Sequence, residues 1–411
     1  MSSFPHTIPD TLGLYAHVPF CQSKCRHCAF ASGAYPQEFI APYLSALHAE
    51  IRKVRSFLIQ EGLPAEAIIN LPIETVYLGG GTPSVLEASN LIQILTSLRE
   101  TFHWKSPVEI TVEVNPESAG LEKFHDYQAG GINRLSLGIQ SSQDSCLKHL
   151  GRIHNVRQSR EAAQTARKAG FENLSVDLIA GLPGQSLQDW RESLEFALEL
   201  APEHVSVYLL EIHRGTQYGD VYGSEGGQLG GKLFWPPLPE EELLEEIYFY
   251  TLESLEKAGF RQYEISNFAK SGFESRHNLR YWRGMPVLGF GCGAFSNYKH
   301  TRWGNVRELS DYLRKTKDGE SVVGEKAVVS SQEMIGEFFF LGMRTLPGIS
   351  VKEFQLNTGL DLLPLFEGPL QFLVENGLIR VSGGMIGLTP RGCILSNEVF
   401  AEFLRFLDSL V

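Results

Sequence analysis

The sequence lacks any apolar run long enough to cross a bilayer, and its first 13 residues carry neither the basic region nor the apolar core of a secretory signal. It also lacks a surplus of positive charge, because 48 Asp and Glu outnumber 36 Lys and Arg, which gives a net charge of −12. We therefore expect a cytoplasmic protein that does not bind nucleic acid. At 411 residues and 43% hydrophobic content, the chain is long enough for two or three globular domains.

Cysteine is also scarce, yet three of the six cysteines fall within eight residues as Cys21, Cys25 and Cys28. An even distribution would place roughly 0.1 cysteine in such a window. The C-x3-C-x2-C spacing would also fit one stripe of a helix, but the cluster follows Pro19 and a strand-like run, and its other residues show no amphipathic pattern. The cluster therefore indicates metal ligands.

Two metal centres fit three clustered thiols. A structural zinc scaffold would need a fourth ligand, and His27, the nominal candidate, lies between two of the cysteines with too little chain to complete a tetrahedron. A [4Fe–4S] cluster on three thiolates fits better and leaves one iron open to bind something else.

The cysteine loop follows a strand-like segment that contains Tyr15 and leads into His17-Val18-Pro19-Phe20. In this arrangement the chain resembles the radical S-adenosylmethionine (SAM) superfamily. The resemblance implies that the open iron is chelated by SAM and that an electron from the cluster breaks a carbon–sulfur bond of the sulfonium. It also implies a partial (β/α)6 barrel.

The first half of the chain alternates strand-like and helix-like segments, which predicts an α/β fold with a parallel sheet. Periodicity leaves an open doubly wound sheet and a partial barrel as alternatives, and the resemblance favours the barrel. The predicted strands are 13–19, 75–79, 108–114, 134–140, 173–179 and 204–210, and predicted helices include 36–60, 84–102, 155–170 and 187–200.

Polar residues and glycines recur where these strands end, and ligands of parallel α/β proteins bind at that edge. Glycines without Cβ atoms allow close backbone approach, and an arginine can pair with the methionine carboxylate of SAM. The resemblance implies that SAM is contacted by Tyr15, His27, Gly80, Gly81, Thr82, Glu113, Gln140, Arg152 and Asp177.

A second motif, His277-Asn278-Leu279-Arg280-Tyr281-Trp282, narrows the resemblance to the branch that holds oxygen-independent coproporphyrinogen III dehydrogenases and HemW-type haem chaperones. The dehydrogenases carry a further cysteine two residues after the third ligand, where this chain has Phe30. His-Asn-x-x-Tyr-Trp is complete and is the chaperone signature associated with haem. The resemblance thus implies haem contacts at His277, Asn278, Tyr281 and Trp282.

These features predict a haem chaperone that binds a [4Fe–4S] cluster, SAM and haem, and passes haem to acceptor proteins, which could be membrane-bound. The alternative is radical-driven oxidative decarboxylation of coproporphyrinogen III, so enzymatic activity is left open. Phe295 stands where the resembled chaperones usually have histidine, so this chain has no second imidazole at that position to contact iron or haem. Cys292 fits a core thiol better than a soft ligand, and Cys146 and Cys393 have no flanking pattern.

The last third of the chain changes character. Seven glycines between 215 and 231 predict a long loop, a helix is expected over 240–257, and three helices (331–343, 350–357 and 362–376) precede a hairpin at 378–388 and a final helix at 391–410. This order predicts a winged-helix-like module. Because the helix 362–376 has no lysine or arginine with which to contact DNA, we expect the module to face protein or to close the barrel. The predicted domains are residues 1–238, 239–329 and 330–411.

Overall fold

The computed structural model describes residues 11–223 and 235–409. Six strands pair in parallel and in sequence order, as the alternating pattern predicted. They are β1 (Leu12–Val18), β2 (Ile73–Gly80), β3 (Trp104–Val114), β4 (Arg134–Gln140), β5 (Leu174–Ala180) and β6 (His204–Leu209). Their carboxyl ends therefore lie along one edge.

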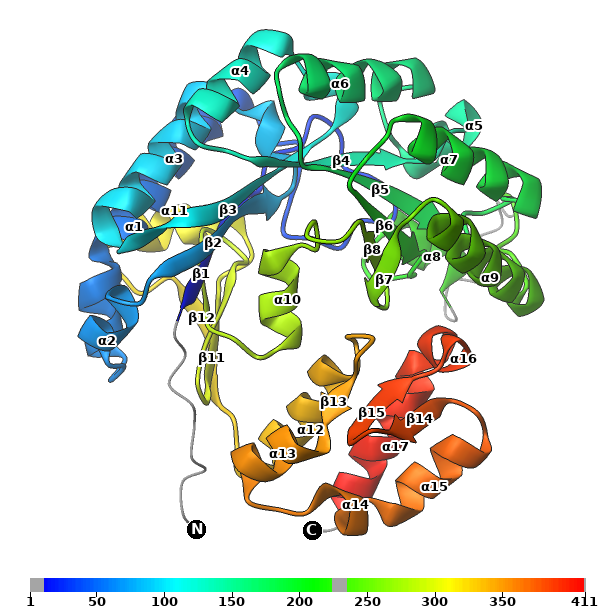
Figure 1. The fold of residues 1–411 in the computed structure, drawn as a ribbon. Helices are drawn as coiled ribbons and strands as arrows, with labels where there is room; N and C mark the ends of the chain where they lie inside the picture. Colours follow the sequence, from blue (N-terminus) through cyan, green and yellow to red (C-terminus); the bar gives the residue numbers. More distant parts are fainter. Residues whose placement is uncertain (1–10, 224–234, 410–411) are drawn as a thin grey trace.

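Helices connect these strands and cover the convex side of the curved sheet (Figure 1). The long ones are α1 (Ile40–Gln60), α3 (Ala88–Thr101), α4 (Leu121–Ala129), α6 (Val156–Lys168) and α7 (Leu187–Glu199), and the short ones are α2 (Ala65–Ile69), α5 (Asp144–Leu150) and α8 (Gln217–Tyr222). The α8 helix corrects the expectation of a continuous loop over 215–231, and residues 224–234 of that loop lie outside the described residues.

The sheet continues beyond the six strands on both sides. β9 (Val287–Phe290) pairs in parallel with β1 and leads to the antiparallel strands β10 (Phe295–Tyr298), β11 (Thr301–Asn305) and β12 (Val323–Val328), while β8 (Asn267–Ala269) and β7 (Arg261–Glu264) extend the sheet from β6. In the described part of the chain, the end strands β12 and β7 do not pair with each other. The curved sheet is thus a partial barrel, which confirms the predicted fold class.

The two faces of the central strands differ in chemistry. The outward face packs against the helices and is apolar, with Leu14, Leu78, Val112, Leu137 and Val176 all buried in the main core.

The inward face is polar, and parallel register places its residues in rows because paired positions share a face. One row runs Tyr15, Tyr77, Thr111, Arg134, and the next runs Glu113, Ser136, Ser175, His204. The interior of the barrel is therefore lined by groups that hydrogen-bond or carry charge.

The short helix α10 (Arg276–Trp282) lies inside the curve of the sheet, near the amino ends of the strands (Figure 1). Arg280 of α10 fixes this position, because its guanidinium donates to Glu74 at 2.6 Å and to the carbonyl of Thr11 at 2.7 Å, at the start of β2 and β1. α9 (Glu241–Lys257) and α11 (Leu309–Asp318) flank the ends of the sheet.

The C-terminal part has its own apolar core and a three-stranded sheet, β13–β15–β14, which fits the predicted winged-helix-like arrangement. That core also takes in Tyr248 of α9, and the exact domain boundaries stay predictions. Its elements are α12 (Ser331–Gly342), β13 (Ile349–Ser350), α13 (Val351–Thr358), α14 (Leu362–Leu365), α15 (Glu367–Glu375), β14 (Ile379–Ser382), β15 (Met385–Leu388), α16 (Pro390–Ile394) and α17 (Ser396–Ser409).

Two helices predicted as continuous are broken. The segment 362–376 divides at Phe366, because Pro369 cannot donate a helical hydrogen bond and its ring would collide with the carbonyl four residues earlier. The segment 391–410 divides at Leu395, whose φ of −97° and ψ of 28° leave the helical region.

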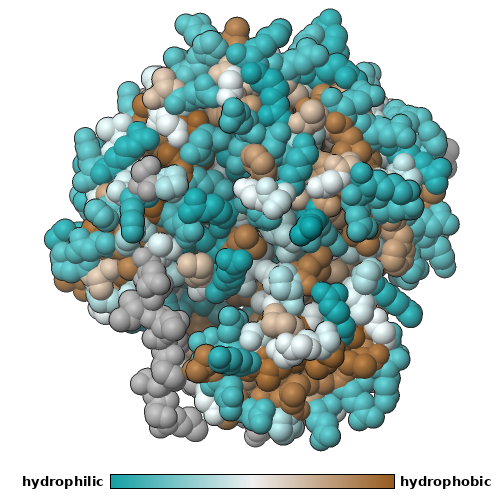
Figure 2. Space-filling view, in the orientation of Figure 1, coloured by the Kyte–Doolittle hydropathy of each residue, from teal (hydrophilic) through white to brown (hydrophobic). Residues whose placement is uncertain are grey.

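Exposed apolar side chains are frequent on the C-terminal part, including Leu356, Phe372 and Val374, and Figure 2 shows hydrophobic surface gathered there. Within residues 11–223 and 235–409, no helix combines the length and apolar composition that crossing a bilayer requires.

Candidate functional site

The cysteine loop leaves β1 at the carboxyl edge of the sheet and is held by backbone hydrogen bonds on three sides. The Cys21 amide donates to the Gly33 carbonyl at 2.9 Å, and the Arg26 amide donates to the Leu150 carbonyl, also at 2.9 Å. The Tyr218 amide in turn donates to the Arg26 carbonyl at 3.0 Å. The loop is thus fixed by the segment at Gly33, by α5 and by α8, although it contains no regular element itself.

All three loop cysteines are free thiols that keep part of their surface exposed. The Thr82 hydroxyl donates to the Cys21 sulfur at 3.7 Å, the Arg152 guanidinium donates to the Cys25 sulfur at 3.5 Å, and a serine hydroxyl lies 3.9 Å from the Cys28 sulfur. Donors around sulfur favour thiolates, the form that binds iron. Burial nevertheless raises the pKa of the Cys21 thiol, against the hydrogen bond from Thr82.

Among the described residues, no three His, Cys, Asp or Glu side chains are placed to hold one metal ion together. A tetrahedral zinc site needs such a convergent set. A [4Fe–4S] cluster does not, because each of its thiolates binds a different iron of the cube. Three neighbouring thiols are the ligand set that a [4Fe–4S] cluster with one open iron requires.

Gly81 provides the wall behind the cysteine loop. A Cβ atom at this position would lie 2.9 Å from the Cys21 sulfur and 2.8 Å from the Phe20 carbonyl oxygen, distances that no side chain tolerates. The Gly81 amide donates to the Val18 carbonyl at 2.8 Å, which draws the end of β2 against the loop. Only glycine permits this approach, so the Gly-Gly-Gly run has a steric reason here.

Glu113 joins the glycine run to the barrel interior. Its carboxylate accepts from the Gly80 amide at 3.0 Å and from the Tyr77 hydroxyl at 2.9 Å. Burial raises the pKa of Glu113 to about 7, with a smaller contribution from the Asp177 carboxylate, while the two hydrogen bonds oppose the shift. Sequence reasoning selected Glu113 but missed Tyr77, whose only signal was its place in the alternation of β2.

Arg152 follows α5 and reaches across the strand ends. One of its nitrogens donates to the Asn115 amide oxygen at 3.0 Å and to the Gly138 carbonyl at 2.6 Å. Asn115 in turn donates to the Thr82 hydroxyl at 3.1 Å. Asn115 thus links two predicted SAM contacts, a role that its position after β3 signalled but that sequence analysis did not assign.

The remaining predicted SAM contacts surround this group at different depths. His27 lies in the cysteine loop with its Nδ1 buried and without a partner among the described residues, and burial lowers its pKa to about 4. Gln140 ends β4 with a φ of 69°, in the left-handed region. Tyr15 and Asp177 each lie three residues before the end of their strands, β1 and β5, and Asp177 accepts from the Ser136 hydroxyl at 3.0 Å. The structure brings most of this set to the carboxyl edge, with these two residues further down their strands.

The four predicted haem contacts lie on α10, and His277 points into the barrel. Its side chain is 1% exposed, and both ring nitrogens are occupied: Nδ1 lies 2.8 Å from the Thr75 hydroxyl and Nε2 lies 3.3 Å from the Tyr281 hydroxyl. The ring stacks on Tyr77 and Tyr15 at centroid distances of 5.1 and 6.4 Å. The predicted haem ligand is thus packed directly beneath residues of the predicted SAM site.

The Trp282 side chain points away from His277, and the backbone of Asn278 belongs to the first turn of α10. The Arg344 guanidinium lies 4.3 Å above the Trp282 ring, so that side chain faces the C-terminal part, and its indole nitrogen is buried without a partner in the described structure. The amide of Asn278 donates to the Ser275 hydroxyl, which caps the helix. The four residues therefore do not form one open surface in this conformation.

Residues 15–197 match the model of the radical SAM superfamily, and residues 329–395 match that of the HemN C-terminal domain. The heme chaperone HemW of Bacillus subtilis is 35% identical over 391 residues, which cover 95% of this chain and 98% of that protein, and HemW of Escherichia coli is 30% identical with 96% and 98% covered. The chain belongs to the HemW family. It is also similar to bovine radical S-adenosyl methionine domain-containing protein 1, mitochondrial, at 31% identity.

A solved structure supports the fold of this HemW-family chain independently. Coproporphyrinogen III oxidase (HemN) from Escherichia coli, a radical SAM enzyme, superposes with a TM-score of 0.80 over 97% of this chain and 91% of that chain. Because the two sequences are 22% identical, the likeness concerns the fold alone.

Membership of the radical SAM superfamily implies a [4Fe–4S] cluster and SAM. The described residues fit both groups. Three thiols are presented at one edge with donors beside their sulfurs, Gly81 leaves room, and buried nitrogens of His27 and Arg152 lack partners among the described residues. Cys292 is fully buried, in agreement with the expected core thiol.

Proposed function

We propose that this protein is a haem chaperone that carries a [4Fe–4S] cluster and SAM, binds haem, and passes it to acceptor proteins, including membrane-bound ones. The main support is similarity to proteins named heme chaperone HemW along 95% or more of this chain in several bacteria. All six cysteines are free thiols, as a reducing compartment such as the cytoplasm would keep them.

In this proposal Cys21, Cys25 and Cys28 would hold the cluster, and the residues around the glycine run would hold SAM beside it. When bound, the cluster would supply the electron that cleaves the sulfonium of SAM. Arg152 has a partnerless Nε for an anionic group, and Glu113, with its pKa near 7, can accept from an amino or hydroxyl group of SAM.

The proposed haem ligand is His277, and its packing sets a condition on binding. A neutral imidazole binds haem iron well, and burial keeps His277 neutral by lowering its pKa to about 3. However, Nε2 is engaged with the Tyr281 hydroxyl at 3.3 Å, the longer of its two hydrogen bonds. We infer that α10 must shift so that Tyr281 releases this nitrogen before iron binds.

The second candidate is an oxygen-independent coproporphyrinogen III dehydrogenase, the other activity of the branch that the His277 to Trp282 motif resembles. Both activities would use the same cluster and SAM residues, so these residues do not discriminate. Phe30 does, because this position holds a further cysteine in the resembled dehydrogenases, and here the phenylalanine is 68% exposed beside the cluster loop. That surface offers no thiol.

The deciding experiment supplies anaerobically reconstituted protein with SAM, reductant and either coproporphyrinogen III or haem. We expect a shifted Soret band and transfer of haem to an apo-haem protein, without formation of protoporphyrinogen. Decarboxylated product would overturn the chaperone proposal in favour of the dehydrogenase. Absence of both haem binding and product would reject the two candidates together.

A further inference from the structure

Arg134 is a buried cation that the proposed cluster and SAM sites do not use. It begins β4, is 2% exposed, and belongs to the inward-facing row of Tyr15, Tyr77 and Thr111. Its guanidinium acts electrostatically on groups of β2, β5, β6, β7 and α10, which surround the barrel interior, namely Tyr77, Asp177, His204, Tyr263 and His277. Arg134 therefore points into the centre of the barrel.

No partner compensates this charge within residues 11–223 and 235–409. Arg134 makes no hydrogen bond or ion pair there, and its buried Nε is unpaired. The nearby Asp177 carboxylate lies beyond ion-pair distance and accepts from the hydroxyls of Ser136 and Ser175 instead. The neighbouring side chains of His204 and His277 cannot compensate the charge either, because an imidazole is neutral or positive.

Arg280 shows what a satisfied buried arginine looks like in the same molecule. It is 1% exposed and donates to the Glu74 carboxylate at 2.6 Å, to Thr11 at 2.7 Å and to the Pro286 carbonyl at 3.0 Å. A buried guanidinium without such partners is strongly destabilising, because its desolvation is not offset by hydrogen bonds or by an opposite charge. Arg134 has the same burial and none of these contacts among the described residues, so its guanidinium is available to pair with a bound group.

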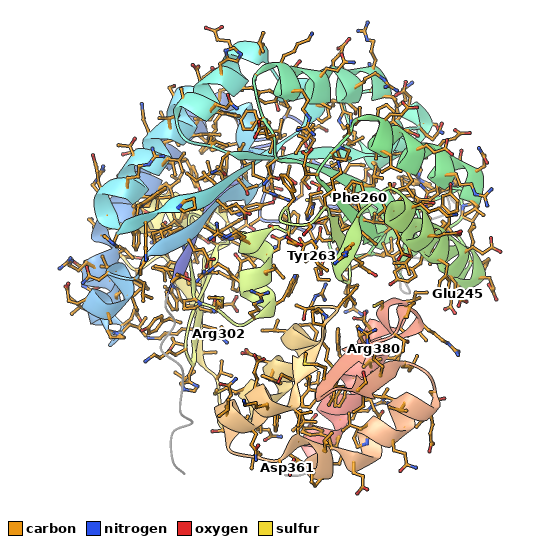
Figure 3. All side chains as sticks on the ribbon, in the orientation of Figure 1. Glu245, Phe260, Tyr263, Arg302, Asp361 and Arg380 are labelled. Atoms are coloured by element: carbon orange, nitrogen blue, oxygen red, sulfur yellow. The ribbon has the colours of Figure 1, made fainter. Side chains whose placement is uncertain are left out.

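Other polar atoms of the same interior also lack partners. The Thr111 hydroxyl, on the residue paired with Arg134, is fully buried without a hydrogen bond in the described structure, and so is the Asn267 amide oxygen on β8. The register of β8 with β6 places Asn267 on the inward face beside Ser206. Tyr263 borders this space, next to the start of α10, where its hydroxyl accepts from the Ser275 amide at 3.2 Å (Figure 3).

We infer that Arg134 is the binding residue for a carboxylate of the ligand that enters the barrel. If the proposed haem function holds, on which this identification rests, the carboxylate is a propionate of haem. A guanidinium matches a carboxylate through two parallel hydrogen bonds, and the Thr111 hydroxyl beside it supplies a further donor. Arg134 and Thr111 would thus bind the propionate edge of the macrocycle. His277, on the neighbouring helix α10, faces the same barrel interior.

The test compares haem with haem dimethyl ester, in which both carboxylates are masked, on cluster-loaded wild type and Arg134→Gln. Affinities are measured by Soret titration in the same detergent. Wild type should prefer haem over the ester by at least about 10-fold, as expected for a charge-assisted pair. Arg134→Gln should lose this preference while binding the ester as well as wild type does.

Each outcome decides the inference. An equal preference in wild type and Arg134→Gln, or no preference in wild type, would overturn the Arg134 site and leave the haem function standing. Failure of wild type to bind either compound would overturn the proposed function and the inference with it. Arg134→Lys, which keeps the charge but not the fork, should show an intermediate preference and serves if Arg134→Gln does not fold. The exposed Arg283→Gln is the matched control and should behave as wild type.

Discussion

The two ends of the barrel interior differ in how exposed their proposed ligand-binding side chains are and in how many of those side chains are hydrogen-bonded. At the carboxyl ends of the strands, the cysteine loop presents half-exposed thiols, and buried nitrogens of His27 and Arg152 have no partner among the described residues. At the amino ends, His277 of α10 is 1% exposed and both of its ring nitrogens are hydrogen-bonded. The first end is prepared for ligands, whereas the second has to be opened.

Tyr77 stands between these two ends. Its hydroxyl donates to Glu113 of the predicted SAM site, and its ring stacks on His277 of the predicted haem motif. The two ends therefore differ in exposure but are also physically connected, because the Tyr77 side chain contacts a residue of each end.

Replacing Cys25 with alanine should have the largest effect. With two thiolates left, the cluster loses one of its three protein ligands, and we expect complete loss of the brown absorption of the cluster. Iron content and visible absorption after anaerobic reconstitution measure this. Cys146→Ala is the matched control, because that thiol lies on α5 outside the loop and should leave four irons per chain. Equal iron in both variants would reject the cluster site.

Gly81→Ala tests the steric wall at the open end. The added Cβ would lie 2.9 Å from the Cys21 sulfur and 2.8 Å from the Phe20 carbonyl, so the loop must move. We expect cluster occupancy or SAM affinity to fall by about 10-fold, through a strain of order 1–3 kcal/mol. Gly120→Ala is the control, because its Cβ would meet nothing closer than 3.8 Å. Normal SAM binding by Gly81→Ala would show that the cysteine loop can move to accommodate the added methyl group.

The carboxyl end of the barrel could be predicted from sequence because its residues belong to short, continuous motifs. The cysteine spacing and the glycine run are continuous motifs, and the strands alternate with helices clearly enough to place both at one edge. The closed end could not, because burial of His277 depends on Thr75 and Tyr77 of a strand some 200 residues earlier. The motif identifies His277, but it does not show whether the ring nitrogens of that histidine are free or hydrogen-bonded.

The polar lining of the barrel was also beyond sequence reasoning. Thr111 and Arg134 read as ordinary members of strands, and only the parallel register shows that they are neighbours on the inward face. The outer antiparallel strands and the breaks at Phe366 and Leu395 were missed for a related reason, since short segments carry too little periodicity to be assigned.

Tyr77 offers a direct test of coupling between the ends. Tyr77→Phe removes the hydroxyl that lowers the pKa of Glu113, so more Glu113 is protonated at pH 7 and SAM should bind about 3- to 10-fold more weakly. Haem affinity should not change, because the ring still stacks on His277. Tyr77→Ala should weaken both. The two affinities are measured by separate titrations, and a Tyr77→Ala variant with unchanged haem affinity would show that the ends are independent.

Tyr281→Phe should open the closed end slightly. It removes the partner of His277 Nε2 without removing the ring that packs edge-on at 5.3 Å. Haem association should become up to about 5-fold faster, the value of one hydrogen bond of roughly 1 kcal/mol, whereas His277→Ala should weaken binding. Stopped-flow Soret kinetics measure both, with Tyr250→Phe as a control remote from α10. Slower association by Tyr281→Phe would mean that Tyr281 assists ligation instead of blocking it.

The smallest expected effect is that of pH. Burial, together with the cations Arg280 and Arg134, lowers the pKa of His277 to about 3, so the imidazole is neutral throughout pH 5 to 8. Protons compete with iron for an imidazole only near and below its pKa. An exposed histidine would therefore lose haem affinity as the pH falls through about 6.5, whereas His277 should not. Haem titrations at pH 8, 7, 6 and 5 should give a flat profile, and a tenfold loss between pH 7 and 5 would place the ligating histidine on the surface and separate haem binding from the barrel interior.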